Sequence, residues 1–368
     1  MTPAETMREL ALGRQIVICA GPGGVGKTTV AAAIALHAAR CGRRACVVTI
    51  DPAKRLADAL GLDALTNEAH RVHGDWDDAG GPASEGDGGA GELWALMLDT
   101  KSTFDDVVIR NAGSPEQARA ILDNHLYRNI SGALGGTQEY MAMEKLYELH
   151  HEGRFDLVVV DTPPTRRALD FLEAPARLMR FLDNRIFRLL MMPTRASLRA
   201  LGVATQLFLR TISRVVGGEI VADAVAFFTA FEGMEDGFRN RAARVEQLLG
   251  DPGTAFVVVA APRRDAVEEA VYFADRLKES PAHVEALVVN RMFPYFGPVP
   301  SGLDRAGPTT AALAANLRDL DQVATREERH LDVLAGHLPG TALVRVPFLA
   351  DDVHDVAGLT ELGKWMFG

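Results

Sequence analysis

Residues Gly21 to Thr28 read GPGGVGKT and match the phosphate-binding pattern G-x-x-x-x-G-K-[ST]. In this pattern, glycines let backbone N–H groups surround phosphate oxygens, a lysine reaches the β- and γ-phosphates, and a hydroxyl ligates Mg²⁺. An apolar run precedes the loop and an Ala-rich helix, predicted over Thr29–Arg40, follows it. The candidate nucleotide contacts are Gly23, Gly24, Val25, Gly26, Lys27, Thr28 and Thr29. Lys27 is a candidate catalytic residue and Thr28 a candidate ligand of Mg²⁺.

Two aspartates follow later apolar runs and could complete this chemistry. Asp51 comes after Cys46–Ile50, and Asp161 comes after Leu157–Val160. The carboxyl ends of parallel strands meet at one edge of a sheet, so both carboxylates should lie near the phosphate loop. One carboxylate would hold the Mg²⁺ shell and the other would orient the attacking water, but the residues alone do not divide these roles. Each aspartate taken alone is equally typical of a turn or a helix cap.

The elements that must position these residues are short apolar runs separated by helical patterns. The runs are apolar on both faces, as a parallel sheet covered by helices requires, and they are Ile16–Cys19, Cys46–Ile50, Leu157–Val160, Phe256–Val259, Ala286–Val289 and Leu343–Val346. This pattern predicts an α/β fold with a doubly wound, mostly parallel sheet. We expect one P-loop domain over residues 1–368, with a helical subdomain at approximately 100–150 and 172–249. Gly- and Pro-rich loops are predicted at 74–91 and 293–308.

Composition narrows the functional classes. The 368 residues include 39 Lys+Arg and 49 Asp+Glu, and the formal net charge of −10 argues against a nucleic-acid partner. The three cysteines lie in the first 46 residues without a C-x-x-C pair, which favours neither a disulfide framework nor a thiolate zinc site. We see no apolar leader and no apolar run near the roughly 18 to 20 residues that span a bilayer. A cytoplasmic location is therefore the expectation.

Taken together and in order, these motifs resemble those of the arsenite-efflux and tail-anchored-protein-targeting ATPases. Residues 21–28 are similar to that family's phosphate loop, residues 51–58 (DPAKRLAD) to its first switch, and residues 161–168 (DTPPTRRA) to its second. Residues 131–144 are similar to a family helix, Asn290 to its adenine-reading asparagine, and Pro347 to a proline beside the base. The resemblance implies ATP and Mg²⁺ as cofactors, Asp51 as the water-positioning residue, and Asp161 with Thr28 on the metal side. ATP rather than GTP rests on Asn290 and on the lack of an N-K-x-D motif.

The resemblance fails at the second residue of the loop, where the family has a lysine that reaches the partner's phosphates and this chain has Pro22. Three hypotheses follow. A homodimer hydrolyses ATP slowly, or Arg166 or Arg167 supplies the charge in cis, or the chain forms a heterodimer with a paralogous ATPase that keeps the lysine. The two arginines are about equally well interpreted as part of a solvated face.

The helical region suggests what the ATPase could act on. Between Arg166 and Arg214 there are ten arginines and three acidic residues, and an apolar stripe at helical spacing runs from Leu198 to Val215. A groove for a hydrophobic helix client, an ordinary helical core and a membrane-associated surface all remain open. A metalloid site there is disfavoured, because no cysteine follows Cys46. We read the ten histidines as surface or core residues rather than metal ligands.

Three functions are therefore open. The first is a Mg²⁺-dependent ATPase whose dimer moves the helical subdomain and binds a hydrophobic or membrane-protein client, as in protein targeting. The second is the soluble energising subunit of an anion or metalloid transporter. The third is a weakly catalytic subunit of a heterodimeric ATPase. Kinase and chromosome-partition functions are disfavoured because we find neither a lid nor a basic arm in the sequence.

Overall fold

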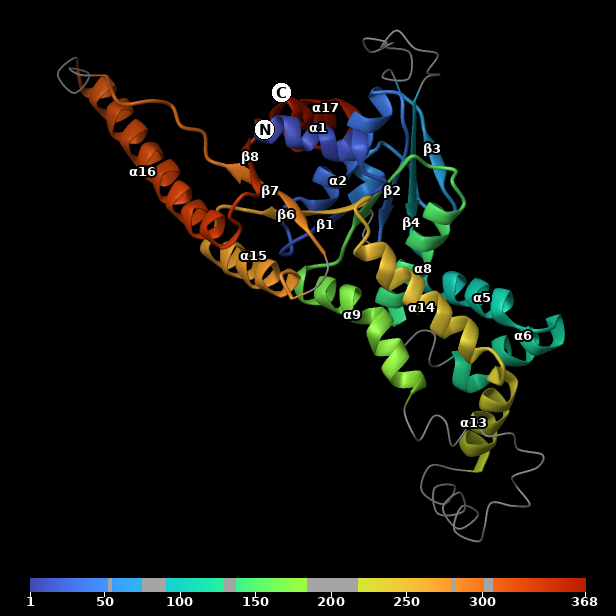
Figure 1. Ribbon diagram of the computed structural model, residues 1–368. Coiled ribbons are helices and arrows are strands. Elements are labelled where there is room, and N and C mark those ends of the chain that lie inside the picture. The colour runs from blue at the N-terminus through green and yellow to red at the C-terminus, as the bar shows by residue number, and fades with distance from the viewer. Residues whose placement is uncertain (52–54, 75–90, 129–136, 184–217, 280–281, 301–306) are drawn as a thin grey trace. The chain divides into compact units, whose positions relative to one another are not determined.

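The computed structural model describes residues 1–51, 55–74, 91–128, 137–183, 218–279, 282–300 and 307–368 (Figure 1). The chain divides into two compact units. The first unit comprises Met1–Leu98, Leu149–Leu169 and Gly250–Gly368, and the second comprises Asp99–Glu148 and Asp170–Leu249. We describe each unit by itself.

The first unit is built on an eight-stranded sheet in the order β3-β4-β2-β5-β1-β6-β7-β8. The strands are β1 (Ile16–Ala20), β2 (Arg44–Thr49), β3 (His70–Val72), β4 (Glu92–Met97), β5 (Leu157–Asp161), β6 (Thr254–Ala260), β7 (Val284–Met292) and β8 (Ala342–Pro347). Every pair is parallel except β3 with β4. The predicted α/β fold with a mostly parallel sheet is confirmed, and the six predicted apolar runs lie in its strands except for Ile50, which directly follows β2.

Strands β3 and β4 are absent from the sequence prediction. β3 has only three residues, and the apolar run of β4 (ELWALM) contains no β-branched residue, so a helix would fit it equally well. β4 is held by tertiary pairing, because it lies parallel to β2 from Arg44 opposite Glu92 to Thr49 opposite Met97. The predicted loop at 74–91 lies almost wholly outside the described residues, and in the loop at 293–308 residues 293–300 have no regular structure.

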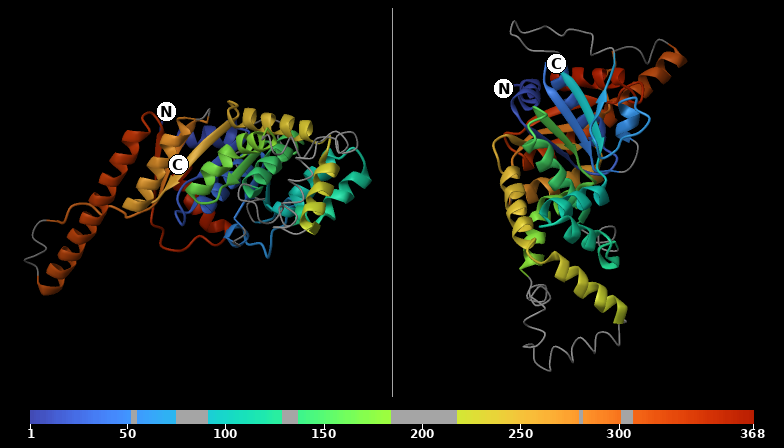
Figure 2. Two further views of the ribbon diagram at one scale, coloured as in Figure 1. Left: turned by 90° about the horizontal axis from the view of Figure 1, so that it is seen from below. Right: turned by 90° about the vertical axis from the view of Figure 1, so that its right-hand side faces the viewer.

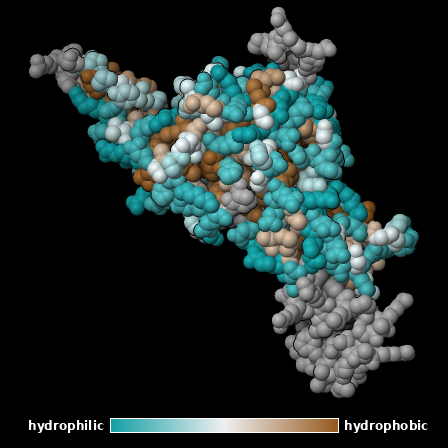
Figure 3. Space-filling view, viewed as in Figure 1, coloured by the Kyte–Doolittle hydropathy of each residue, from teal (hydrophilic) through white to brown (hydrophobic). Residues whose placement is uncertain are grey.

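Six of the helices that the structure describes lie wholly in the first unit. They are α1 (Pro3–Gly13), α2 (Lys27–Arg40), α3 (Arg55–Ala59), α15 (Arg264–Leu277), α16 (Pro308–His337) and α17 (Val356–Phe367). α1, α2 and α17 pack together over one face of the sheet, and α15 lies on the other face against β6 and α16 (Figure 1). In the view of Figure 3, hydrophobic residues show mainly around this sheet. The segment that follows β7 runs alongside α16 in Figures 1 and 2.

Helix α2 follows the phosphate loop and is fixed by small side chains. Its alanines at 31, 32, 33, 35, 38 and 39 are almost completely buried. Since alanine adds little volume, the helix can lie close to β2 and β5 and to α17. This packing holds the N-terminus of α2 at the carboxyl end of the sheet, where its backbone N–H groups and its dipole favour an anion.

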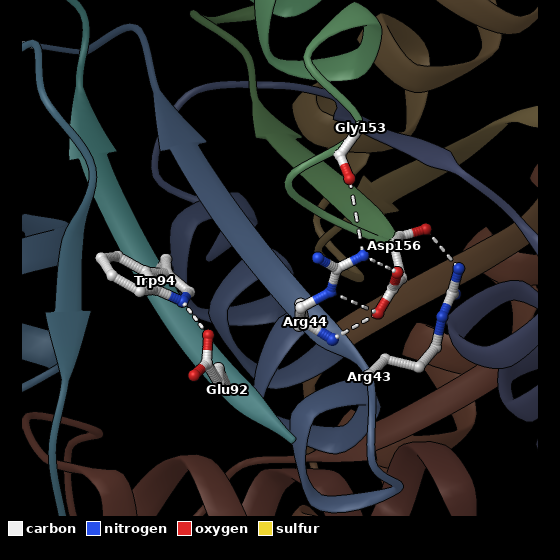
Figure 4. Close-up of polar contacts among 6 residues, drawn as sticks. All are labelled: Arg43, Arg44, Glu92, Trp94, Gly153 and Asp156. Atoms are coloured by element: carbon white, nitrogen blue, oxygen red, sulfur yellow. Dashed lines mark hydrogen bonds and ion pairs between the residues drawn. The ribbon is translucent and has the colours of Figure 1, made fainter. Parts of the chain in front are cut away.

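Polar contacts surround the amino-terminal ends of β2, β4 and β5, at the end of the sheet far from the phosphate loop (Figure 4). Arg44 begins β2, and its guanidinium contacts the carboxylate of Asp156 at 2.7 Å. Arg43 donates to the backbone carbonyl of Asp156, and the indole of Trp94 donates to Glu92 at 3.0 Å. The Arg44 guanidinium lowers the pKa of the Asp156 carboxyl below its usual range. The contacts of Arg43 and Arg44 with Asp156 join the start of β2 to the start of β5, at the end of these strands far from the phosphate loop.

The second unit is helical and has a core of its own. Its helices are α5 (Thr100–Asn111), α6 (Pro115–Leu122), most of α8 (Thr137–His151), most of α9 (Thr165–Leu182), α13 (Gly218–Phe231) and α14 (Glu235–Leu249). Aromatic rings form much of the core, with ring centroids 5.7 Å apart for Phe227 and Phe231 and 5.1 Å apart for Phe231 and Phe238. The apolar stripe from Leu198 to Val215 lies outside the described residues. No described helix is long and apolar enough to cross a membrane.

Candidate functional site

A cavity of about 650 Å³ opens at the carboxyl ends of the strands in the first unit. Its walls come from the phosphate loop, the start of α2, the ends of β2 and β5, the end of β7 and the segment after β8. The sequence-predicted residues that line it are Gly23, Gly24, Gly26, Lys27, Thr28, Thr29, Asp51, Asp161, Asn290 and Pro347. Val25 is buried behind this wall, with its side chain in the core. The structure thus brings together residues that are up to 324 positions apart in the chain.

At two positions of the phosphate loop, neighbouring atoms leave no room for a side chain, so glycine is required. A Cβ on Gly21 would lie 1.9 Å from the carbonyl oxygen of Val259, and a Cβ on Gly26 would lie 2.2 Å from Nδ2 of Asn290. Gly26 also has a φ of 95°, which L side chains rarely adopt. The loop therefore curls as tightly as phosphate binding needs only because no side chain stands at these positions.

Lys27 lies at the first position of α2, and its side chain is held against its own loop. The residue is only 8% exposed, and Nζ donates to the carbonyl oxygen of Pro22 at 2.9 Å. Burial lowers the pKa of the Lys27 ammonium, and Asp161 and Asp51 oppose this shift by favouring the charged form. The lysine is thus a positioned cation in a cavity whose described walls carry several carboxylates.

Asp161 ends β5 and receives hydrogen bonds from two hydroxyls. Thr28 Oγ1 donates to its Oδ2 at 2.7 Å, and Thr49 Oγ1 donates to the same oxygen at 3.0 Å. Burial raises the pKa of Asp161, while these hydrogen bonds and Lys27 act in the opposite direction. Among the residues that the structure describes, its second oxygen, Oδ1, has no hydrogen-bond partner although it is buried.

These contacts fit a Mg²⁺ ion. When the Thr28 hydroxyl donates its proton to Asp161, its lone pairs are left for a cation. A buried carboxylate oxygen without a partner is a second hard oxygen donor. In the described part of the chain, no group of three or more His, Cys, Asp or Glu could hold a metal by itself. Mg²⁺ commonly completes such a shell with water and substrate phosphates.

Asp51 comes two residues after the end of β2, and its backbone N–H donates to Thr49 Oγ1 at 3.3 Å. It is half-buried and lines the same cavity as Lys27. Thr49 thus contacts both aspartates, through its hydroxyl, and links the ends of β2 and β5. Residues 52–54 of the first switch lie outside the described residues.

Asn290 is held by the phosphate loop. Its Nδ2 donates to the carbonyl oxygen of Val25 at 2.9 Å, and its Oδ1 accepts from the backbone N–H of Arg291 at 2.9 Å. The side chain is 6% exposed. Pro347, at the end of β8, lines the cavity as well. These contacts leave the second N–H of the Asn290 amide for another acceptor.

Several cavity residues were missed by sequence reasoning. Arg55 and Arg291 are cations in the wall, and Asp58, Asp351 and Asp352 are acidic neighbours. Arg55 lies within the first-switch motif and Arg291 directly follows Asn290, so their places in the motifs could have identified them. Arg166 and Arg167 lie at the start of α9, where side chains are outside the described part.

The anion-transporting ATPase family model matches residues 14–78 and 92–296 of the chain. The matched ranges include the phosphate loop, both aspartates and Asn290. The chain belongs to the anion-transporting ATPase family. The prediction of an ATPase of this family is thereby confirmed.

Known proteins of related sequence agree with this assignment. The chain is 28% identical to ATPase GET3 of Malassezia globosa over 46% of its own length and 44% of that protein. It is 21% identical to the putative arsenical pump-driving ATPase 1 of Aquifex aeolicus over 96% of this chain and 79% of that one. It is 25% identical to ATPase GET3B of Arabidopsis thaliana over 98% of this chain and 82% of that one. The match thus spans less than half of the Malassezia relative.

Proposed function

We propose that the chain is a Mg²⁺-dependent ATP hydrolase. The observation that supports this most directly is the hydrogen bond from Thr28 to Asp161 at the head of α2, in a cavity shared with Lys27 and Asp51. The phosphate loop binds the β- and γ-phosphates, with Lys27 as the cation. Asp51 accepts a hydrogen bond from the attacking water and orients it toward the γ-phosphate.

Thr28 and Asp161 would hold Mg²⁺, which supplies charge stabilisation to the phosphates during transfer. Asp161 orients the Thr28 hydroxyl through the 2.7 Å hydrogen bond. Asn290 would use its remaining N–H on the nucleotide base, with Pro347 beside it. The proposed preference for ATP over GTP rests on Asn290 and on the lack of an N-K-x-D motif.

The second unit suggests which kind of client the ATPase acts on. We propose that a dimer couples nucleotide binding to movement of the helical unit, which binds a hydrophobic helix or a membrane-protein client. Two relatives are named as GET3 ATPases, and α9 begins directly after the cavity residue Pro164. The described core of the helical unit is largely aromatic, and the apolar stripe of the sequence, Leu198 to Val215, lies outside the described residues. A cytoplasmic site of action accords with the composition.

Two alternatives have support. A transporter-energising subunit is favoured by the Aquifex relative's name, but Cys19 and Cys46 are buried and only Cys41 is exposed. A weakly catalytic subunit of a heterodimer is favoured by Pro22, which cannot supply a cation to a partner subunit.

The test is ATP turnover of the purified full chain with Mg²⁺, with particle mass measured with and without nucleotide. Turnover that is lost in Asp51→Asn, accompanied by a nucleotide-dependent dimer, would support the hydrolase. The matched control is Asp332→Asn, an exposed aspartate on α16 outside the cavity, which should leave turnover unchanged. Tight ATP binding by a monomer with no Asp51-dependent turnover would contradict the homodimer. It would direct the search to a paralogous partner that carries the loop lysine.

A further inference from the structure

Arg291 has an unusual backbone conformation at the rim of the nucleotide cavity. Its φ is 63°, and in the described part of the chain it is the one residue other than glycine with a positive φ. An L side chain is strained in this region, and such residues cluster at ligand sites. The pairing of β7 with β8 shifts register between Val289 and Met292. A bulge of this kind redirects a side chain at the end of a strand.

Contacts on both sides hold this conformation. The backbone N–H of Arg291 donates to Oδ1 of Asn290, whose amide in turn donates to the phosphate loop at Val25. The carbonyl of Met292 accepts from the backbone N–H of Phe348 at 2.7 Å. The backbone N–H of Phe293 donates to the carboxylate of Glu327 on α16 at 2.6 Å. The strained residue is therefore fixed by the phosphate loop, β8 and α16 together.

The result is a guanidinium at the phosphate loop. Arg291 Nη1 lies 3.5 Å from the carbonyl oxygen of Gly24, and Arg291 and Gly24 both line the cavity. Within the described residues this long contact is the one hydrogen bond of a side chain that is exposed and has five donors. Its remaining donors are available to a ligand in the cavity.

The cavity needs further positive charge for a triphosphate. Its described walls carry five aspartates, at 51, 58, 161, 351 and 352, against Lys27, Arg55 and Arg291. The loop offers no cation besides Lys27, because its second residue is Pro22. A guanidinium suits phosphate oxygens, since its planar fork can donate two parallel hydrogen bonds.

We propose that Arg291 binds the phosphates of the nucleotide in the same chain, as a second cation beside Lys27. This inference rests on the proposed function, because it assumes that the cavity holds ATP. Asn290 acts as the positioning residue that ties the Arg291 turn to the loop.

The test compares binding of ATP and of inorganic tripolyphosphate, each with Mg²⁺, by the full chain and its variants. Arg291→Gly removes the guanidinium while glycine accepts the positive φ, so the variant should fold at least as stably as the wild type. It should bind both ligands about tenfold or more weakly, as expected for loss of a charged hydrogen bond. Arg291→Lys, which keeps the charge, should recover part of this loss.

Arg264→Ala is the matched control, because it removes an exposed arginine of α15 that pairs with Glu268 outside the cavity. Its affinity for both ligands should equal that of the wild type. Unchanged affinity in Arg291→Gly, with normal binding by the wild type, would overturn the inference alone. Weaker binding of ATP with unchanged tripolyphosphate binding would also overturn it and place the guanidinium on the base. Failure of the wild type to bind ATP would instead overturn the proposed function itself.

Discussion

At the scale of single residues, the site depends on positions where a side chain is excluded and on hydroxyls that orient a carboxylate. Gly21 and Gly26 lie where a Cβ would meet a backbone oxygen or the Asn290 amide. Thr28 and Thr49 both donate to one oxygen of Asp161 and leave the other without a partner among the described residues. These contacts within the protein fix the shape of the loop and the orientation of Asp161.

Gly26→Ala should weaken both folding and nucleotide binding. The new Cβ would lie 2.2 Å from Asn290 Nδ2 at a φ of 95°, so the loop or Asn290 must move. We expect a loss of about 1 to 3 kcal/mol in the free energy of unfolding and a loss of at least tenfold in ATP affinity. Urea unfolding and titration calorimetry measure the two effects.

The matched control is Gly340→Ala, in the turn before β8, where φ is 82° and nothing lies within 4 Å of the added Cβ. It should lose about 1 kcal/mol of stability and keep its ATP affinity. Equal ATP affinity in both variants would show that the loop does not depend on the Gly26 contact.

At the scale of elements, different contacts join the helices within each of the two units. In the first unit, α2 packs against α17, and the rings of His37 and Phe367 stack with centroids 3.8 Å apart. In the second unit, α8 is joined to α14 by Glu144, which pairs with Arg241 at 2.7 Å and accepts from the hydroxyl of Tyr140. Each contact gives a prediction for one pair of helices.

His37 should make stability depend on pH. Burial, with Arg8 and Arg40 nearby, lowers the pKa of His37 from 6.5 to about 4. The unfolded chain therefore binds this proton more tightly, and the contribution of His37 to stability is complete above pH 6.5 and is lost as the pH falls toward 4. His37→Phe keeps an aromatic ring against Phe367 and removes the titration. Its free energy of unfolding should fall less than that of the wild type between pH 6.5 and 4.

The control is His125→Gln, which changes an exposed histidine of the second unit and should retain the pH profile of the wild type. Chemical unfolding at several pH values measures the difference. A His37→Phe profile parallel to that of the wild type would contradict the prediction.

Arg241→Ala should destabilise the helical unit. The side chain of Glu144 is 2% exposed, and removal of its cation leaves a buried carboxylate without its ion pair. We expect a loss of about 3 kcal/mol in the free energy of unfolding. Arg239→Ala changes an arginine two positions earlier on α14, paired with Asp183 and Asp236 at the surface, and should lose at most about 1 kcal/mol. Similar losses in both variants, measured by urea unfolding, would show that burial does not decide the strength of the Glu144 pair.

At the scale of the whole molecule, the described cavity belongs to the first unit alone, because none of its lining residues lies in the second. Simple binding would therefore stabilise the first unit, by about 2.7 kcal/mol at a ligand concentration of one hundred times Kd. The proposed coupling requires more, because the helical unit must respond to a ligand bound in the first unit.

Hydrogen exchange in Asp51→Asn with ATP and Mg²⁺ tests this coupling. In this variant bound ATP should persist, because the residue that orients water is changed. Protection should rise at the phosphate loop and at β7, and exchange should also change in α13 and α14 of the second unit. ADP should give a smaller change in α13 and α14. Changes confined to the first unit would contradict coupling while leaving nucleotide binding intact.

The sequence by itself determined the phosphate loop, the two aspartates and six of the eight strands, β1, β2, β5, β6, β7 and β8. These features depend on local patterns, namely glycine spacing, a lysine before a hydroxyl, and runs that are apolar on both faces. Strand β4 was not predicted, because its short run lacks β-branched residues and its strand conformation is stabilised by pairing with β2 and β3. Only the tertiary structure joined Asp161 to Thr28, tied Asn290 to the phosphate loop and brought Arg291 to its rim. Residues far apart in the chain meet only when parallel strands end at the same edge of the sheet. The direction in which the Arg291 side chain points depends on the register shift between β7 and β8, which no local sequence pattern encodes.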